Sequence, residues 1–166
     1  MPCRDRGAPS YDARLEPWDA LLRLGLARQV DFGGGVAVDC GGRSRAESVY
    51  NGLVATRGTW ETDDWILVHD AARPCLASAE LERLCREVES DDVGGLLALP
   101  IADTVKRAAS DEAGVARAAA TEDRAQLWLA QTPQMFRAGL LAQALQRASG
   151  IVTDEAAAIE QMGFRP

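Results

Sequence analysis

The chain has 166 residues, 47% of them hydrophobic and 26% charged, with a formal net charge of −7. This length and composition predict a globular protein with one hydrophobic core, and no stretch reaches the roughly 20 apolar residues that a membrane helix needs. The N-terminal sequence has no apolar core of the kind found in signal peptides, so we expect a cytoplasmic protein. The acidic charge and the lack of an obvious basic face argue against a nucleic-acid partner.

The first hundred residues show strands alternating with helices. The patterns predict helices at 17–29, 44–57 and from 78 onward, and strands between and after them at 36–38, 65–68 and 95–100. Ser44 and Glu47 form a capping-box pattern, which marks the start of the second helix. Such alternation favours right-handed crossovers and a mostly parallel sheet with helices on both faces. The predicted fold class is α/β.

The alternation breaks after Pro100. Two extended segments, at 103–108 and 115–124, flank a turn-forming stretch at 110–114. Strands joined in this way form a β-hairpin. We therefore expect a hairpin arm at about 103–124 that projects from the α/β body.

After the arm, the alternation resumes. A strand is predicted at 127–130 and a helix at 137–148, followed by a last helix for which Thr153 would be the N-cap. Asp154 and Glu155 would then lie in the first turn, where negative charge suits the helix dipole. All residues, 1–166, are expected to belong to one domain.

Several polar clusters fall where predicted strands end, which is where ligands bind to open parallel sheets. Taken singly, each cluster has an ordinary explanation as a turn or a helix cap, but their coincidence predicts a binding site. The clusters are at 41–48, 70–74, 103–104, 132–134 and 153–155. The four cysteines form no C-x-x-C pair and His69 is the only histidine, so no zinc site is expected.

Five segments of the chain match the motifs of a known family in order. They are GGRSRAESVYNGL, VHDAARPCL, PIADTVKRA, TEDRAQLWLAQTPQMF and TDEAAAIEQMGF, at 41–53, 68–76, 100–108, 121–136 and 153–164. Together they resemble the 2-C-methyl-D-erythritol 4-phosphate cytidylyltransferases, over roughly residues 36–164. The resemblance implies a Rossmann-like fold of the nucleotide-diphospho-sugar-transferase type.

The resemblance also implies a reaction, the transfer of CMP from CTP to 2-C-methyl-D-erythritol 4-phosphate in non-mevalonate isoprenoid biosynthesis. A phosphate oxygen of the acceptor attacks the α-phosphorus of CTP, and pyrophosphate leaves. That oxygen is already anionic, so alignment and charge neutralisation by Mg²⁺, arginine and lysine replace a strong base. Two alternatives stay open: a cytidylyltransferase for ribitol 5-phosphate, and a non-catalytic remnant that dimerises or binds nucleotide.

Carried over position by position, the resemblance implies a role for each matching residue. The residues expected beside the cytosine and ribose of CTP are Gly41, Gly42, Arg45 and Ser48. Those expected at the acceptor and its phosphate are Arg73, Thr104, Arg124, Thr132 and Thr153. Asp70 and Ala71 would lie beside the ribose and the phosphate path, with Asp70 close to Mg²⁺. Asp70 and Arg124 are the expected catalytic residues, and His69 is interpreted as a packing residue.

Two of the family's segments have no counterpart in this sequence. One is an Ala-Ala-Gly-x-Gly-x-Arg loop with a later Pro-Lys, which grips the triphosphate, and the other is an Asn-x-Lys segment near the C-terminus. Neither the glycines at 33–35 nor Lys106 is expected to replace them. The resemblance thus implies an incomplete domain, inactive and poorly folded by itself. The family's arms interlock across a twofold axis, which implies a homodimer in which Thr104 and Arg124 act on the partner's site.

Overall fold

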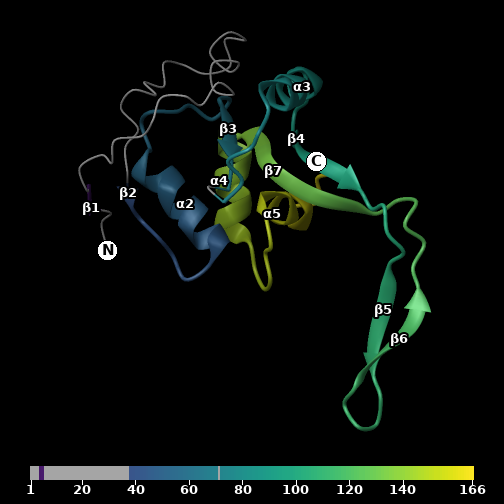
Figure 1. The fold of residues 1–166 in the computed structure, drawn as a ribbon. Helices are drawn as coiled ribbons and strands as arrows, with labels where there is room; N and C mark the ends of the chain where they lie inside the picture. The colour runs from purple at the N-terminus through teal and green to yellow at the C-terminus, as the bar shows by residue number, and fades with distance from the viewer. Residues whose placement is uncertain (1–3, 6–37, 71) are drawn as a thin grey trace. The chain divides into compact units, whose positions relative to one another are not determined.

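The structure is a computed structural model that describes residues 4–5, 38–70 and 72–166. It contains two compact units, which we name the body, Met1–Leu96 with Thr132–Pro166, and the arm unit, Leu97–Gln131 (Figure 1). The predicted helix at 17–29 lies outside the described residues. So does most of the predicted strand at 36–38, of which only Val38 is described, in a short strand of the body.

Seven strands are described, in three sheets. They are β1 (Arg4–Asp5), β2 (Val38–Asp39), β3 (Trp65–Val68), β4 (Gly94–Pro100), β5 (Lys106–Ser110), β6 (Ala116–Thr121) and β7 (Trp128–Arg137). The largest sheet has the order β3-β7-β4, while β1 pairs with β2 and β5 pairs with β6. The predictions for β3 and β4 are confirmed in type and, within one residue, in extent.

Strand β7 departs from the prediction in direction and in length. It runs antiparallel to β3, with Trp65 opposite Arg137 and Val68 opposite Gln134. The chain reaches β7 through a hairpin excursion and not through a crossover helix, and a crossover is what makes neighbouring strands parallel. The strand also continues past 127–130 to Arg137, so the polar residues predicted to follow the strand lie inside it.

Four helices are described: α2 (Arg45–Ala55), α3 (Ser78–Val88), α4 (Ala138–Arg147) and α5 (Glu155–Gln161). The capping prediction for α2 is confirmed, since the Ser44 hydroxyl accepts a hydrogen bond from the Glu47 amide at 3.1 Å. The N-cap prediction for α5 is wrong by one residue. Asp154 has the extended backbone of an N-cap and accepts from the Ala157 amide at 2.9 Å, and aspartate caps at least as well as threonine.

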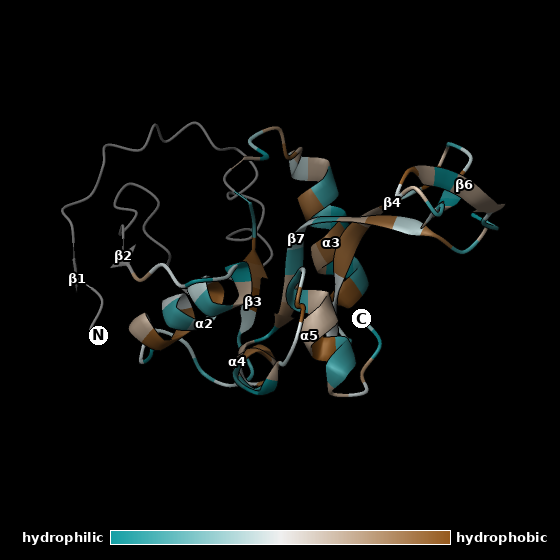
Figure 2. Cartoon of the chain, turned by 90° about the horizontal axis from the view of Figure 1, so that it is seen from below, coloured by the Kyte–Doolittle hydropathy of each residue, from teal (hydrophilic) through white to brown (hydrophobic). Residues whose placement is uncertain are grey.

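The hydrophobic core of the body joins three helices to the buried half of β7. Its buried residues are Leu53, Phe136, Leu141, Ala144, Leu145, Ala156, Ala158 and Ile159. Figure 2 shows hydrophobic residues along β3, whereas the helices alternate between hydrophobic and hydrophilic positions, as expected for helices with one buried face. This packing fixes the first turn of α5 close to β7 and α2.

The arm unit contains the predicted hairpin, which is confirmed with shorter strands. Strands β5 and β6 pair antiparallel from Lys106 opposite Thr121 to Ser110 opposite Ala116, and every residue of both strands is exposed. The turn is closed by Asp111, whose carboxylate accepts from the Val115 amide at 2.9 Å. No helix within the described ranges is long and apolar enough to cross a membrane.

Candidate active site

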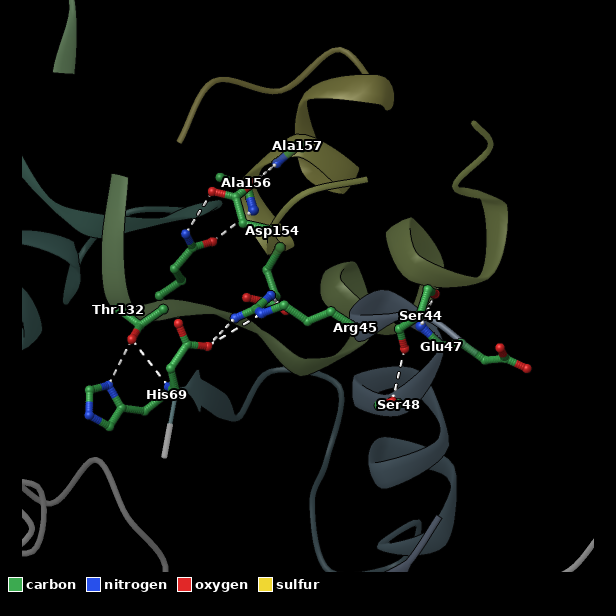
Figure 3. A network of polar contacts seen from close by, with 12 residues as sticks. Ser44, Arg45, Glu47, Ser48, His69, Thr132, Asp154, Ala156 and Ala157 are labelled. Atoms are coloured by element: carbon green, nitrogen blue, oxygen red, sulfur yellow. Dashed lines mark hydrogen bonds and ion pairs between the residues drawn. The ribbon is translucent and has the colours of Figure 1, made fainter. Parts of the chain in front are cut away.

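An arginine from α2 joins two carboxylates that are far away in the sequence. Arg45 donates from Nε and from one terminal nitrogen to Oδ1 of Asp70, at 3.3 and 3.1 Å, and its other terminal nitrogen pairs with Oε1 of Glu155. Asp70 follows the end of β3, and Glu155 begins α5. The three residues therefore bring together three of the predicted polar clusters at one place in the body. Figure 3 shows Arg45 within this network.

The charges of this cluster are balanced. The Glu155 side chain is fully buried, whereas 31% of the Arg45 side chain and 36% of the Asp70 side chain are exposed. Oδ2 of Asp70 also pairs with Nε of Arg73 at 3.4 Å, so two arginines face two carboxylates. Burial lowers the pKa of the Arg45 guanidinium, but Glu155 and Asp70 outweigh burial and raise that pKa above its ordinary value. Arg45 is therefore charged at every physiological pH.

Thr132 ties β7 to the end of β3. Its hydroxyl accepts a hydrogen bond from the Asp70 amide at 3.2 Å and contacts Nδ1 of His69 at 3.0 Å (Figure 3). Nε2 of His69 lies 2.8 Å from the carbonyl oxygen of Arg73. Both ring nitrogens are thus engaged within the protein, and the interpretation of His69 as a packing residue stays a prediction. These contacts hold His69 and Asp70 against β7 at the end of β3.

Gln134 and Glu155 are two polar residues of this region to which the sequence analysis gave no role in the site. Gln134 is 1% exposed; its amide nitrogen donates to Asp154 at 2.8 Å, and its oxygen accepts from the Ala156 amide at 2.9 Å. It therefore holds the start of α5 against β7. The sequence signal for Gln134 was its place in the predicted polar cluster at 132–134, which gave this residue no contact of its own. The burial of Glu155 gave no signal, because a glutamate in a first helical turn is normally solvated.

The predicted cytidine loop folds onto the first turn of α2. The Ser48 hydroxyl accepts from the Gly42 amide at 2.9 Å and donates to the Ser44 carbonyl at 2.9 Å (Figure 3 shows Ser44 and Ser48). A Cβ on Gly42 would lie 2.5 Å from Cγ of Glu47, so the close approach of this loop favours glycine. Gly41 is exposed, and a Cβ there would meet nothing within 4 Å.

The other predicted site residues are spread over both units. Thr153 is exposed and directly precedes the N-cap of α5, whereas Ala71 lies outside the described residues. Thr104 and Arg124 are exposed residues of the arm unit. The structure thus brings Arg45, Asp70, Arg73 and Thr132 into one hydrogen-bonded network of the body. The substrate contacts predicted for all these residues stay predictions.

The fold is that of an α/β nucleotidyltransferase. A crystal structure of 4-diphosphocytidyl-2C-methyl-D-erythritol synthase is similar, with a TM-score of 0.66 and 48% sequence identity over 76% of this chain and 57% of that one. The family model for 2-C-methyl-D-erythritol 4-phosphate cytidylyltransferase (IspD) matches residues 23–166. The chain belongs to this family, which confirms the resemblance found in the sequence.

Curated relatives agree with this assignment and show how much of the family is present. The 2-C-methyl-D-erythritol 4-phosphate cytidylyltransferase of Dechloromonas aromatica (strain RCB) is 57% identical over 129 residues, which are 78% of this chain and 54% of the relative. That of Thiobacillus denitrificans is 56% identical over 127 residues, which are 76% of this chain and 54% of the relative. The chain spans about half the length of these relatives.

Proposed function

We propose that this protein acts in the transfer of CMP from CTP to 2-C-methyl-D-erythritol 4-phosphate, with release of pyrophosphate. One observation carries the proposal beyond family membership. Three segments that the family resemblance assigns to substrate binding meet at Arg45, which joins the start of α2 to Asp70 and to Glu155 at the start of α5. The meeting of three separate segments at one place supports a common site over a set of separate turns and caps.

The proposed chemistry relies on alignment and on positive charge. A bond forms between an acceptor phosphate oxygen and the α-phosphorus of CTP, while the bond from the α-phosphorus to the bridging oxygen breaks and pyrophosphate leaves with that electron pair. The attacking oxygen is already anionic, so no side chain needs to remove a proton. We assign the cytosine and ribose to the loop of Gly41, Gly42 and Ser48. Arg73 would bind the acceptor, because a guanidinium binds phosphate with both charge and fixed geometry.

We propose that Asp70, whose carboxylate also pairs with Arg45 and Arg73, would supply one protein ligand to Mg²⁺. Within residues 4–5, 38–70 and 72–166, no group of three or more His, Cys, Asp and Glu side chains is arranged to hold a metal. Magnesium in phosphate chemistry commonly takes one or two carboxylates and completes its shell with phosphate oxygens and water. The partly exposed carboxylate of Asp70 meets that requirement. Mg²⁺ held there with the phosphates of CTP would neutralise the charge that develops in the reaction.

We propose further that the protein acts as a homodimer, in which Thr104 and Arg124 of the arm complete the partner's site. The arm unit exposes several large apolar side chains, which a partner could cover: Leu99, Val115, Leu127, Trp128 and Leu129 are 56%, 48%, 38%, 59% and 50% exposed. Large apolar side chains that are exposed to solvent can mark an interface. The cytoplasmic location expected from the sequence stays a prediction.

The test uses a grafted enzyme, defined as the Dechloromonas aromatica relative with its matched region replaced by the matching residues of this chain. Pyrophosphate release from CTP is measured with 2-C-methyl-D-erythritol 4-phosphate and, separately, with ribitol 5-phosphate. We expect turnover with the first acceptor and little with the second, and negligible turnover by the 166-residue chain alone. A preference for ribitol 5-phosphate would overturn the proposed acceptor. A grafted enzyme that binds CTP without turnover would favour the non-catalytic alternative.

A further inference from the structure

We infer that Glu155 is a positioning residue: its buried carboxylate holds the Arg45 guanidinium, and Arg45 in turn fixes the Asp70 carboxylate at the end of β3. The inference rests on the proposed function for the catalytic role of Asp70. It adds a residue that touches no substrate. Glu155 acts across 110 positions of sequence on Arg45, and Arg45 acts across 25 positions on Asp70.

Glu155 is not needed to cap its own helix. The Ala157 amide of α5 is bound by Asp154 at 2.9 Å, and the Ala156 amide is bound by Gln134 at 2.9 Å. The Glu155 side chain makes neither of these contacts. Within the described residues, its one hydrogen-bonded partner is Arg45, and its second carboxylate oxygen, Oε2, has none. The contacts of the Glu155 carboxylate are therefore those of a partner for Arg45 and not those of a helix cap.

The burial of Glu155 makes this pairing obligatory. Its side chain is fully buried, and a buried carboxylate is tolerated where a cation and hydrogen bonds compensate for the lost water. Arg45 is the compensating cation, so its guanidinium is held from the buried side while its Nε and NH2 reach Asp70. A long arginine side chain that was anchored only at Asp70 would keep much of its rotamer freedom.

The arrangement also sets the charge around Asp70. Arg45 and Arg73 both contact the Asp70 carboxylate, and together they carry two positive charges. Glu155 balances one of them. Without the charge of Glu155, Asp70 would face two arginines with no second carboxylate, and Arg45 would be free to turn toward Asp70 or toward solvent. The Asp70 carboxylate would then lose its fixed orientation, and misplacement of about 1 Å can cost about a hundredfold in rate.

The experiment compares Glu155→Gln, Glu155→Asp and the matched control Glu160→Gln in the grafted enzyme. Glu160 is an exposed glutamate of the same helix. We expect Glu155→Gln to lower kcat about tenfold or more, because the lost positioning acts on the reacting geometry. Glu155→Asp keeps the charge and should recover part of kcat. Glu160→Gln should equal the unsubstituted grafted enzyme.

A double variant separates positioning from a structural role of α5. If Glu155 acts through Arg45, then Arg45→Met with Glu155→Gln should have the kcat of Arg45→Met alone, within about twofold. Losses that multiply would overturn the inference, as would an unchanged kcat in Glu155→Gln. If Glu155→Gln alone does not fold, the double variant takes its place, because it leaves no buried charge unpaired. A double variant with the kcat of the unsubstituted enzyme would then overturn the inference.

A second readout does not depend on turnover. The Nε–H proton of Arg45, assigned by its loss in Arg45→Met, is followed by NMR in the grafted enzyme. We expect its exchange with solvent to become at least about tenfold faster in Glu155→Gln but not in Glu160→Gln, since the hydrogen bond to Asp70 loses its anchor. Equal exchange in all three proteins would contradict the inference. Absent turnover with the expected exchange difference would instead contradict only the proposed function.

Discussion

The body and the arm unit each contain an arginine–glutamate pair, and the two pairs differ in burial and in reach. In the body, Arg45 pairs with a fully buried glutamate 110 positions away. In the arm, Arg107 pairs with Glu122 at 2.5 Å across neighbouring strands, with 68% of the arginine side chain exposed. The first pair connects separate parts of the fold, whereas the second adds to a hairpin that its backbone ladder already defines.

The difference shows which polar contacts this fold depends on. A buried carboxylate must keep its cation, because loss of the cation leaves an unpaired charge in the core and destabilises the fold. An exposed pair exchanges its partner for water at little cost. We therefore expect single substitutions in the body network to disturb both stability and the candidate site. Substitutions in the exposed pairs of the arm should stay local.

The contrast between the two pairs is tested most directly by removing each arginine in turn. Arg45→Met should lower the free energy of unfolding of the grafted enzyme by about 3–5 kcal/mol, because Glu155 stays buried without a cation. Arg107→Met should change it by less than about 1 kcal/mol. Urea denaturation at constant protein concentration measures both. Equal losses of unfolding free energy in the two variants would show that burial does not decide how much each pair contributes to stability.

A matched pair of leucines gives the next largest effect. Leu141 of α4 is fully buried, whereas Leu99 of the arm unit is 56% exposed. Leu141→Ala should cost about 3 kcal/mol in the free energy of unfolding, for the lost burial and the cavity left behind. Leu99→Ala should cost about 0.5 kcal/mol or less.

Protein concentration sharpens the result for Leu99. A loss that grows as the protein is diluted would mean that a second subunit covers Leu99, in agreement with the proposed homodimer. A loss above about 2 kcal/mol that does not depend on concentration would contradict the contrast between the two units.

A third test asks whether the arm takes part in the reaction. In the grafted enzyme, Arg124→Ala should raise the KM for the acceptor and lower kcat, with a combined loss of about tenfold to hundredfold, because a charged hydrogen bond to phosphate is removed. The KM for CTP should hardly change. The control is Arg107→Met, the exposed arm substitution that is expected to change the free energy of unfolding by less than about 1 kcal/mol. Weaker CTP binding with an unchanged acceptor KM would place Arg124 at the other substrate.

Mixed subunits extend this test to the homodimer. When subunits with Arg124→Ala are combined with subunits with Asp70→Ala, some heterodimers should contain one site with both residues intact. Partial recovery of activity is therefore expected if the arm acts on the partner's site. Heterodimers that form without any recovery would show that each site uses residues of one chain.

The features that could be predicted from sequence were those set by neighbouring residues. Ser44 and Glu47 predicted the start of α2 because a capping box is a contact between positions three residues apart. The turn between β5 and β6 was similarly evident from Asp111 to Gly114, where Gly114 has a φ of +78°. The segment after β3 was found by its motif, and the structure places Asp70 in the network of the body.

The features that were missed depend on contacts between distant segments. The direction of β7 is decided by its pairing with β3, about 70 positions earlier, and no local pattern in the strand records its partner. The burial of Glu155 and the bridging role of Gln134 need the packing of α5 on β7. The one-residue error at the N-cap of α5 arose because Thr153 and Asp154 are both good caps, and tertiary packing selects between them.

The smallest expected effect concerns the turn of the arm. Asp111 accepts hydrogen bonds from Arg117 and from the amides of Val115 and Ala113, and these contacts hold the pKa of its carboxyl below the ordinary value of 3.8, with 30% of its side chain exposed. A carboxyl with a lowered folded-state pKa contributes stability above its unfolded pKa and loses it as the pH falls through the folded value. The turn should therefore keep its structure at pH 6 and loosen only below about pH 4. NMR cross-peaks between β5 and β6 in the grafted enzyme would follow this loss.

Asp111→Asn should loosen the turn already at pH 6, since an amide pairs less strongly with Arg117, whereas Glu112→Gln in the same turn should have no effect. Cross-peaks that persist unchanged in Asp111→Asn would show that the backbone ladder alone holds the hairpin, and the exposed polar contacts of the arm would then matter even less than the comparison with the body suggests.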